Sequence, residues 1–268
     1  MAEGALPHRR DTLDFTGGLD FTGKVVLVTG GARGVGRGIT ERFAAAGATV
    51  YVCGRTAPAD AIGAEFIAAD VRDAEQVKTL VATIVERSGH LDVVVNNAGG
   101  SPPAESASAS ARFSTAIVAL NLLAPLFVSQ AANEIMQVQE GGGVILNIAS
   151  VSGLRPSPAT AAYGAAKAGL INLTATLAVE WAPKVRVNAV TVGMVRTEQA
   201  PLWYGDDAGI AAVGATVPLG RMAEPGDIGD VCLMLASPLA RYVSGANLVV
   251  HGGGEKPAYI DAANAPRP

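Results

Sequence analysis

Short β-branched segments alternate with helix-length segments along almost the whole chain of 268 residues. The expected strands are apolar without a polar alternation, which is typical of strands buried on both faces of a parallel sheet. The alternation therefore predicts an α/β fold: one domain with a doubly wound parallel sheet of about seven strands and helices on both faces. The expected strands are Val25–Thr29, Thr49–Cys53, Glu65–Ala69, Asp92–Val95, Gly143–Ile148, Val185–Thr191 and Asn247–Val250.

The helices between these strands set the limits of the predicted domain. They are expected at Val35–Ala46, Ala74–Ser88, Ala111–Val138, Ala161–Trp181 and Pro225–Ala236. The domain then spans residues 19–254, with a flexible polar tail at 1–18 and a C-terminal tail at 255–268. The segment 198–217, between the sixth strand and the last helix, is the expected lid over a substrate.

Charge, cysteine content and hydropathy exclude several classes of function. A net charge of −4 without a run of like charges argues against nucleic-acid binding. Cys53 and Cys232 are too few for a disulfide framework, and three scattered histidines argue against a metal centre. The apolar stretch Ala116–Val128 is interrupted by Asn121 and Pro125 and is shorter than the roughly 18 residues of a membrane span. No secretory signal is expected, so we predict a cytoplasmic protein without a membrane partner.

A glycine-rich loop joins the first strand to the first helix. Glycine permits a tight turn and lets the backbone approach a pyrophosphate held by N–H groups at a helix N-terminus. The spacing is Gly-x-x-x-Gly-x-Gly, which differs from the general G-x-G-x-x-G fingerprint, and a ligand-free glycine turn is the alternative. The position of the loop favours a dinucleotide. The expected contacts are Gly30, Arg33, Gly34, Val35 and Gly36.

The end of the second strand bears on the choice of cofactor. Arg55 follows this strand, and no Asp or Glu is present there to bind the adenosine ribose hydroxyls. A guanidinium suits a 2′-phosphate, so NADP(H) is favoured over NAD(H), although Arg55 as a solvated arginine stacked on adenine is the alternative. Further cofactor contacts are expected after the third and fourth strands, at Asp70, Val71, Asn97, Ala98 and Gly99.

Tyr163 and Lys167 are four residues apart in an expected helix, so both side chains lie on one face. A tyrosine with an ordinary pKa near 10 needs a drop of about 3 units to act as a base at neutral pH. A nearby lysine cation shifts the pKa of a phenol in that direction. Ser150 ends the fifth strand, where a hydroxyl is able to hold a substrate oxygen.

Together, and in this order, these motifs resemble the short-chain dehydrogenase/reductase family, from about Leu19 to Gly253. The resemblance implies a Rossmann fold and the interconversion of a carbonyl and a secondary alcohol. It implies Tyr163 as the acid/base, Ser150 as the donor to the carbonyl oxygen, and Lys167 as the residue that binds the nicotinamide ribose and tunes Tyr163. Asn121 matches the fourth catalytic position of the family.

Pro125 predicts a local distortion of the helix at Asn121. A proline has no N–H to donate to the carbonyl four residues earlier, so the Asn121 carbonyl is left without its helical partner. We expect a kink there, with this carbonyl holding a water that connects Lys167 to solvent. An asparagine satisfied by a neighbouring helix is the alternative.

The segment after the sixth strand completes the predicted site. The resemblance implies that the Val195 N–H meets the nicotinamide carboxamide and that Thr197 is the threonine of the family's motif. Gly193 is a further expected cofactor contact, although Val192 replaces the usual proline of a Pro-Gly turn. His251 replaces the aspartate of the common Asp-Gly-Gly and is expected to be a loop or interface residue. The expected substrate pocket comprises Ser152, Met194, Trp203 and Tyr204.

The predicted function is an NAD(P)-dependent oxidoreductase for an apolar ring or acyl-type substrate, because adjacent aromatic residues suit an apolar surface. The alternatives are a catalytically idle dinucleotide-binding sensor or scaffold and an epimerase or dehydratase of the same family. A serine hydrolase is disfavoured, because no Gly-x-Ser-x-Gly elbow surrounds Ser150. The helices Ala111–Val138 and Ala161–Trp181 are apolar on more than one face, so we expect a homotetramer, with a dimer as the alternative.

Overall fold

Seven parallel strands pair into one sheet in the order β3-β2-β1-β4-β5-β6-β7, which confirms the predicted fold class. The computed structural model describes residues 19–60, 62–255 and 257–262, so the predicted tail at 1–18 lies outside the described residues. The strands are β1 (Val25–Thr29), β2 (Thr49–Gly54), β3 (Glu65–Ala68), β4 (Val93–Asn96), β5 (Gly143–Ser150), β6 (Val185–Val192) and β7 (Asn247–Val250).

The direction of winding reverses between β1 and β4. The chain moves outward from β1 through β2 to β3, then returns to the other side of β1 and continues from β4 to β7. The segments that follow β1 and β4 therefore leave the sheet in opposite directions. A crevice at the carboxyl ends of the strands forms at such a reversal and is the usual ligand site of an open parallel sheet.

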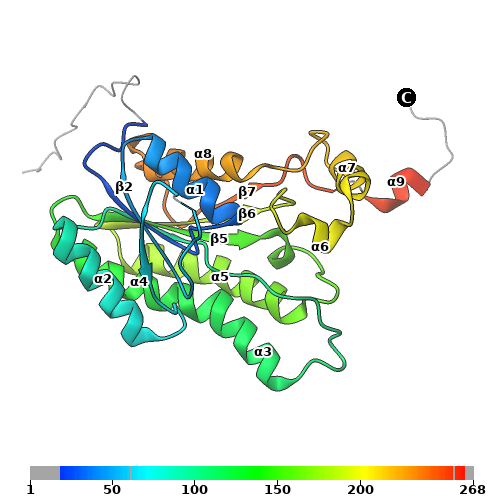
Figure 1. Cartoon of the computed structure of the whole chain (residues 1–268), viewed down its shortest axis with the longest axis horizontal. Coiled ribbons are helices and arrows are strands. Elements are labelled where there is room, and N and C mark those ends of the chain that lie inside the picture. Colours follow the sequence, from blue (N-terminus) through cyan, green and yellow to red (C-terminus); the bar gives the residue numbers. More distant parts are fainter. Residues whose placement is uncertain (1–18, 61, 256, 263–268) are drawn as a thin grey trace, which may run out of the picture.

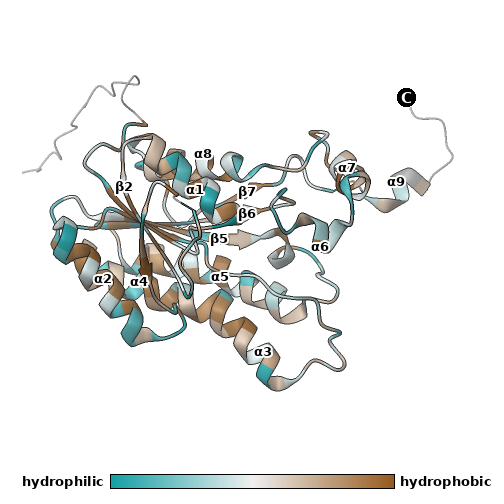
Figure 2. Ribbon diagram, viewed as in Figure 1, coloured by the Kyte–Doolittle hydropathy of each residue, from teal (hydrophilic) through white to brown (hydrophobic). Residues whose placement is uncertain are grey.

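Helices cover both faces of the sheet. α1 (Gly34–Ala45) and α8 (Pro225–Ala236) lie on one face, and α2 (Ala74–Ser88), α4 (Ala124–Val138) and α5 (Ala161–Glu180) lie on the other (Figure 1). Successive residues of β1 point to opposite faces, so each half of the core receives alternate residues of the strand. This explains why the strands are uniformly apolar in sequence, and Figure 2 shows the hydrophobic residues concentrated in the central strands.

The predicted helix Ala111–Val138 is divided into three parts. α3 (Ala111–Val118) leads into a π-helical turn, η1 (Ala119–Leu123), and α4 follows directly. The distortion lies just before Pro125, as the missing N–H of a proline requires. The whole run of 28 residues is long and apolar enough to cross a membrane. In this structure the run instead packs against α2, α5 and the sheet.

Four strands end one or two residues later than predicted: β2 at Gly54, β4 at Asn96, β5 at Ser150 and β6 at Val192. Ser150 and Val192 pair with each other at the last position of the β5–β6 register. The C-terminal region also differs from a wholly irregular tail, since the alanine-rich segment Ala258–Ala262 forms the short helix α9. The predicted lid contains α6 (Ala200–Tyr204) and α7 (Asp207–Thr216).

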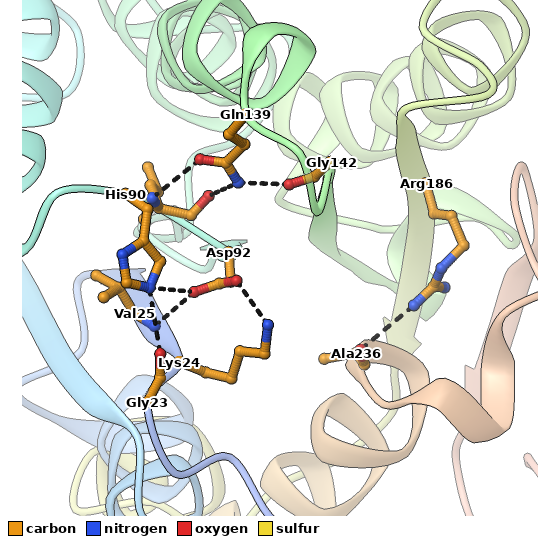
Figure 3. A network of polar contacts seen from close by, with 10 residues as sticks. Gly23, Lys24, Val25, His90, Asp92, Gln139, Gly142, Arg186 and Ala236 are labelled. Atoms are coloured by element: carbon orange, nitrogen blue, oxygen red, sulfur yellow. Dashed lines mark hydrogen bonds and ion pairs between the residues drawn. The ribbon is translucent and has the colours of Figure 1, made fainter. Parts of the chain in front are cut away.

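Polar contacts join the strands at the opposite, amino-terminal edge of the sheet (Figure 3). The Asp92 carboxylate accepts hydrogen bonds from the Val25 N–H and from Lys24 Nζ, each at 2.9 Å, and lies 3.0 Å from His90 Nε2. Gln139 Nε2 donates to the carbonyl oxygens of Leu91 and Gly142. These contacts hold the starts of β1, β4 and β5 in place relative to one another, which stabilises the sheet at the edge opposite the carboxyl ends of the strands.

Candidate active site

The carboxyl ends of β1, β4, β5 and β6 meet at one edge of the sheet, on the side of α6 (Figure 1). The segments that follow these strands contain the predicted cofactor and catalytic residues. Each segment is short and is held by backbone or side-chain contacts to its neighbour. Residues from four distant parts of the chain are thereby brought into one region.

The glycine loop has the geometry that its sequence predicts. Gly30 and Gly34 adopt φ of +64° and +52°, a conformation that side chains rarely take. A Cβ on Gly36 would overlap the Gly30 carbonyl oxygen, so this position also requires glycine. Arg33 occupies the N-cap of α1 but makes no side-chain capping bond, and the first turn has no acidic residue. The first N–H groups of α1 and its positive dipole end therefore suit an anion such as a pyrophosphate.

The segment after β4 is locked to this loop. Thr29 Oγ1 accepts hydrogen bonds from the backbone N–H groups of Asn97 and Ala98, both at 3.0 Å. Asn97 Nδ2 donates to the carbonyl oxygens of Thr29 at 3.0 Å and Gly30 at 3.2 Å. A Cβ on Gly30 would lie 3.1 Å from the Ala98 Cα. Small residues thus form a backbone surface on which a flat cofactor fits closely.

The segment after β6 lies across the same loop. A Cβ placed on Gly34 would meet the Thr197 side chain at 3.6 Å. Val195 forms a β-bridge with Ala223, which holds this segment in an extended path. A Cβ on Gly193 would come within 2.7 Å of the His251 Cβ, so glycine is required there even without the usual proline. His251 therefore packs as a loop residue, as predicted.

Arg72 is a contact that the sequence prediction omitted. Its Nε and Nη2 donate to the two Asp70 oxygens at 2.9 and 2.5 Å. Arg72 is the main reason that the Asp70 pKa falls to about 2, and the charge of Arg55 contributes. Arg55 and Asp70 therefore lie close together, but Arg72 already holds the carboxylate that was expected at the adenine edge. Val71 is buried in the core beneath them. The Asp-x-Arg spacing was the available sequence signal.

The predicted catalytic residues converge at the end of β5. Lys167 is buried and its Nζ donates to the Ile148 carbonyl oxygen at 2.7 Å. The same Nζ lies 5.7 Å from the centre of the Tyr163 ring. Tyr163 shares a hydrogen bond with Ser150, whose Oγ also accepts from the Ser152 N–H at 3.2 Å. A phenol and a hydroxyl, both partly exposed, thus lie beside a buried ammonium.

The protonation of Tyr163 differs from the expectation. Burial raises the pKa of Tyr163, and only the hydrogen bond with Ser150 opposes this increase. Burial also lowers the pKa of Lys167 to about 8. The predicted lowering by Lys167 is therefore wrong for this structure, because the ammonium donates to Ile148 and burial disfavours both charged forms. At neutral pH the phenol is protonated and able to donate a proton.

Asn121 is fully buried within η1, and its side chain is held by the loop after β4. Its Oδ1 accepts from the Gly100 N–H, and its Nδ2 donates to the Gly100 and Ile117 carbonyl oxygens, each at 2.9 Å. A Cβ on Gly99 would lie 2.7 Å from Asn121 Oδ1 and 3.3 Å from Lys167 Nζ. Asn121 and Lys167 are therefore close neighbours. The water relay through the Asn121 carbonyl stays a prediction.

The predicted substrate residues lie in less uniform surroundings. Ser152 follows Ser150 in a 3₁₀ turn, Val151–Gly153. Met194 and Tyr204 pack against a small cluster of the lid formed by Ala200, Ile210 and Met222. Trp203 is 49% exposed. Tyr204 thus serves packing within its own region, whereas Trp203 presents part of its ring to solvent.

A glycine loop at a helix N-terminus, a crevice where the sheet reverses, and a tyrosine–lysine–serine group at the adjacent strand end define an α/β oxidoreductase of the dinucleotide-binding class. The family model described as enoyl-(acyl carrier protein) reductase matches residues 30–255. The chain belongs to the short-chain dehydrogenase/reductase family.

Individual relatives support the family assignment over nearly the full length. The chain is 34% identical to L-fucose dehydrogenase of Bos taurus, over 89% of this chain and 92% of the relative. It is 36% identical to 3alpha-hydroxysteroid dehydrogenase of Mediterraneibacter gnavus, over 85% and 96%. The solved structure of Thermoplasma acidophilum aldohexose dehydrogenase superposes with a TM-score of 0.83 at 30% identity, covering 93% of this chain and 98% of that one.

Proposed function

We propose that this protein is an NADP(H)-dependent enzyme that interconverts a carbonyl and a secondary alcohol. The convergence of Tyr163, Ser150 and Lys167 beside the glycine loop supports this function most strongly. Relatives named as dehydrogenases of sugar and steroid alcohols support the same reaction class.

The residues present fit the dinucleotide that the family implies. The N–H groups of the α1 first turn suit its pyrophosphate, and the small surface at Asn97–Gly99 suits its flat rings. Lys167 is the residue that we propose for the nicotinamide ribose, because its ammonium lies at the end of β5 beside Tyr163. When bound, the nicotinamide supplies or accepts a hydride. Tyr163 then donates its phenolic proton to the substrate oxygen in reduction and recovers it in oxidation, while the Ser150 hydroxyl holds that oxygen.

The preference for NADP(H) over NAD(H) rests on the adenosine end of the site. Arg55 follows β2 and lies near Asp70, whose negative charge is paired with Arg72. Two guanidinium groups close to one satisfied carboxylate favour a 2′-phosphate, whereas an unpaired carboxylate would repel it.

For the substrate, we propose a small ring molecule with an apolar face. Leu202 and Trp203 are 82% and 49% exposed on the lid, so they offer an apolar and aromatic surface. Rings of this kind include both sugars, whose C–H faces stack on aromatic side chains, and steroids.

We further propose a cytoplasmic homotetramer, with a dimer as the alternative and no role for nucleic acid or membrane. A hollow of about 590 Å³ lies between α2, α4 and α5, and its lining includes Leu126, Phe127, Leu173 and Trp181. Val179 is 80% exposed on α5. Apolar surface of this extent on two long helices favours burial against another subunit.

The decisive test is an alcohol panel with NADP⁺ and NAD⁺, followed by nicotinamide absorbance and compared with Tyr163→Phe. We expect turnover with lower KM for NADP⁺, and a loss in kcat of about 10³-fold in the variant. Cofactor affinity should stay within about twofold, because the ring remains in place. A protein that binds the cofactor but oxidises and reduces nothing would instead be the idle sensor or scaffold. Products of epimerisation or dehydration would assign the other alternative.

A further inference from the structure

A polar group at the rim of the substrate region joins three segments that follow neighbouring strands. Arg155 lies in the loop after β5, Tyr204 in the lid after β6, and Glu255 in the segment after β7. Arg155 Nη2 donates to Glu255 Oε1 at 2.5 Å across 100 residues of sequence. Tyr204 is half-buried, and its hydroxyl lies within range of the charges of both residues. No motif predicted this group.

The backbone conformation of the segment after β7 brings Glu255 next to Arg155. Gly252, Gly253 and Gly254 have φ of +65°, +97° and +87°, a run that only glycines adopt without strain. A Cβ on Gly252 would lie 2.6 Å from the Val217 side chain, and one on Gly253 would lie 2.8 Å from the Pro218 Cβ. The three glycines thus turn the chain back closely over the end of the lid.

Arg155 is fixed relative to the catalytic serine. Its N–H donates to the Val151 carbonyl oxygen at 3.1 Å, and its Nη1 donates to the Pro156 carbonyl oxygen at 3.0 Å. A Cβ on Gly153 would come within 2.8 Å of the Lys167 backbone, so this turn packs directly on α5. The guanidinium is therefore held a few residues beyond Ser150 by a rigid turn.

We propose that Arg155 and Glu255, with Tyr204 beside them, bind a hydroxyl group at the far end of the substrate and so select hydroxylated ring substrates. This inference rests on the proposed function and narrows its substrate class. The side chains of Arg155 and Glu255 are 40% and 42% exposed, so a ligand is able to reach them.

The chemistry of the pair favours a hydroxyl over other groups. A hydroxyl accepts from a guanidinium and donates to a carboxylate at the same time, which neither an anion nor an apolar group does. An anionic substrate group would meet the charge of Glu255, and an apolar group would desolvate two charges without replacing their hydrogen bonds. The pair has no net charge, so it offers directional bonds instead of long-range attraction.

The test compares two substrates that share the reacting carbon. L-Fucose and tetrahydropyran-2-ol are both cyclic hemiacetals, but the second has no other hydroxyl group. In Glu255→Gln and Arg155→Gln we expect the KM for L-fucose to rise about tenfold, while kcat stays nearly unchanged. A tenfold change corresponds to the loss of one charge-assisted hydrogen bond. The kinetics of tetrahydropyran-2-ol should stay the same.

Asp230→Asn is the matched control, because it breaks the Arg42–Asp230 pair of similar exposure on α1 and α8. This variant should leave the KM and kcat for both substrates unchanged. Equal changes with both substrates in Glu255→Gln would mean that the pair only fastens the C-terminal segment, which overturns the proposal. A wild-type enzyme that oxidises tetrahydropyran-2-ol as efficiently as L-fucose also overturns it, while the proposed function stands.

If no alcohol is oxidised, the proposed function is contradicted. A binding measurement then tests the hydroxyl site independently of activity. In a Trp181→Phe background, the fluorescence of Trp203 reports on the lid next to Tyr204. The protein is titrated with L-fucose in the presence of NADP⁺. Quenching of the Trp203 fluorescence that is lost after Glu255→Gln supports the hydroxyl site. Absence of quenching in the parent protein overturns it.

Discussion

At the scale of single residues, burial decides the chemistry of the site more than spacing does. Tyr163 and Lys167 lie on one helical face, as their separation predicts, but the surroundings shift both pKa values against charge. The protonated phenol matches the role of an acid toward a carbonyl. The ammonium donates to the Ile148 carbonyl oxygen at 2.7 Å.

The buried Lys167 makes stability depend on pH. Its pKa is about 8 in the folded state against 10.5 in the unfolded state, so the unfolded chain binds more protons between these values. Stability should therefore rise with pH over this window. Relative to Lys167→Met, the free energy of unfolding of the wild type should increase by about 3 kcal/mol between about pH 7 and pH 10.5. Urea unfolding of both proteins across this range measures it, and a difference independent of pH would contradict it.

Gly36 should tolerate no side chain. In Gly36→Ala the new Cβ would overlap the Gly30 carbonyl oxygen, which belongs to the backbone and has no room to rotate away. We expect a loss of stability of about 1–3 kcal/mol and weaker dinucleotide binding. Gly141→Ala is the control, because nothing lies within 4 Å of its Cβ position. Urea midpoints and a cofactor titration test both, and equal behaviour of the two variants would refute the assignment.

At the scale of elements, the ends and interruptions of helices position the functional groups. The π-helical turn η1 places Asn121 against Gly100, beside the region of Lys167. The uncapped start of α1 faces the glycine loop, whereas α2 begins with Asp73 accepting from two backbone N–H groups. An N-terminus left without such a cap is suited to a ligand in place of a side chain.

The C-terminal end of α8 depends on Arg186 at the start of β6. Its Nη2 donates to the Ala236 carbonyl oxygen at 3.3 Å (Figure 3). The same Nη2 donates to the Leu235 carbonyl oxygen at 2.9 Å, and Nη1 donates to the Val243 carbonyl oxygen at 3.0 Å. Arg186→Met should lower the free energy of unfolding by about 2–3 kcal/mol, because carbonyls at a helix end lose their partner. Arg186→Lys should recover only part of this loss in urea unfolding. Equal stability of the Arg186→Met variant and the wild type would exclude this role.

At the scale of the whole molecule, the two faces of the sheet have different surroundings. α1 and α8 pack closely, since a Cβ on Gly38 would overlap the Pro225 backbone. α4 and α5 instead leave a hollow of mixed apolar and polar lining, and Val179 and Val138 are exposed on the outside. This asymmetry is the reason for the proposed assembly through α4 and α5.

A charge on this outer surface should break the assembly. Val179 is 80% exposed, so Val179→Asp should leave the isolated subunit folded but dissociate an interface that buries this position. Light scattering after gel filtration should show the proposed tetramer for the wild type and a smaller species for the variant. Glu41→Ala, on α1 at the other face, is the control and should keep the wild-type mass. A wild-type monomer, or a variant with unchanged mass, would contradict the proposed interface.

Most of the strands and long helices could be predicted from the sequence, because strand and helix periodicity and short motif spacings are local properties. Val25–Thr29, Ala74–Ser88 and Pro225–Ala236 begin and end where their patterns predict. The glycine loop and the Tyr163–Lys167 spacing likewise require only a few neighbouring residues. Function class followed from these motifs together, since their order along the chain fixes the strand ends at which they lie.

Features that depend on burial or on contacts between distant segments could not be predicted from the sequence and became visible only in the folded chain. The pairing of Ser150 with Val192 extends β5, and the return of the C-terminal segment brings Glu255 to Arg155. The pKa of Tyr163 rises because the folded chain partly removes the phenol from water, which no local spacing reveals. Local geometry is encoded within a few residues, whereas desolvation and long-range pairing exist only once the sheet is complete.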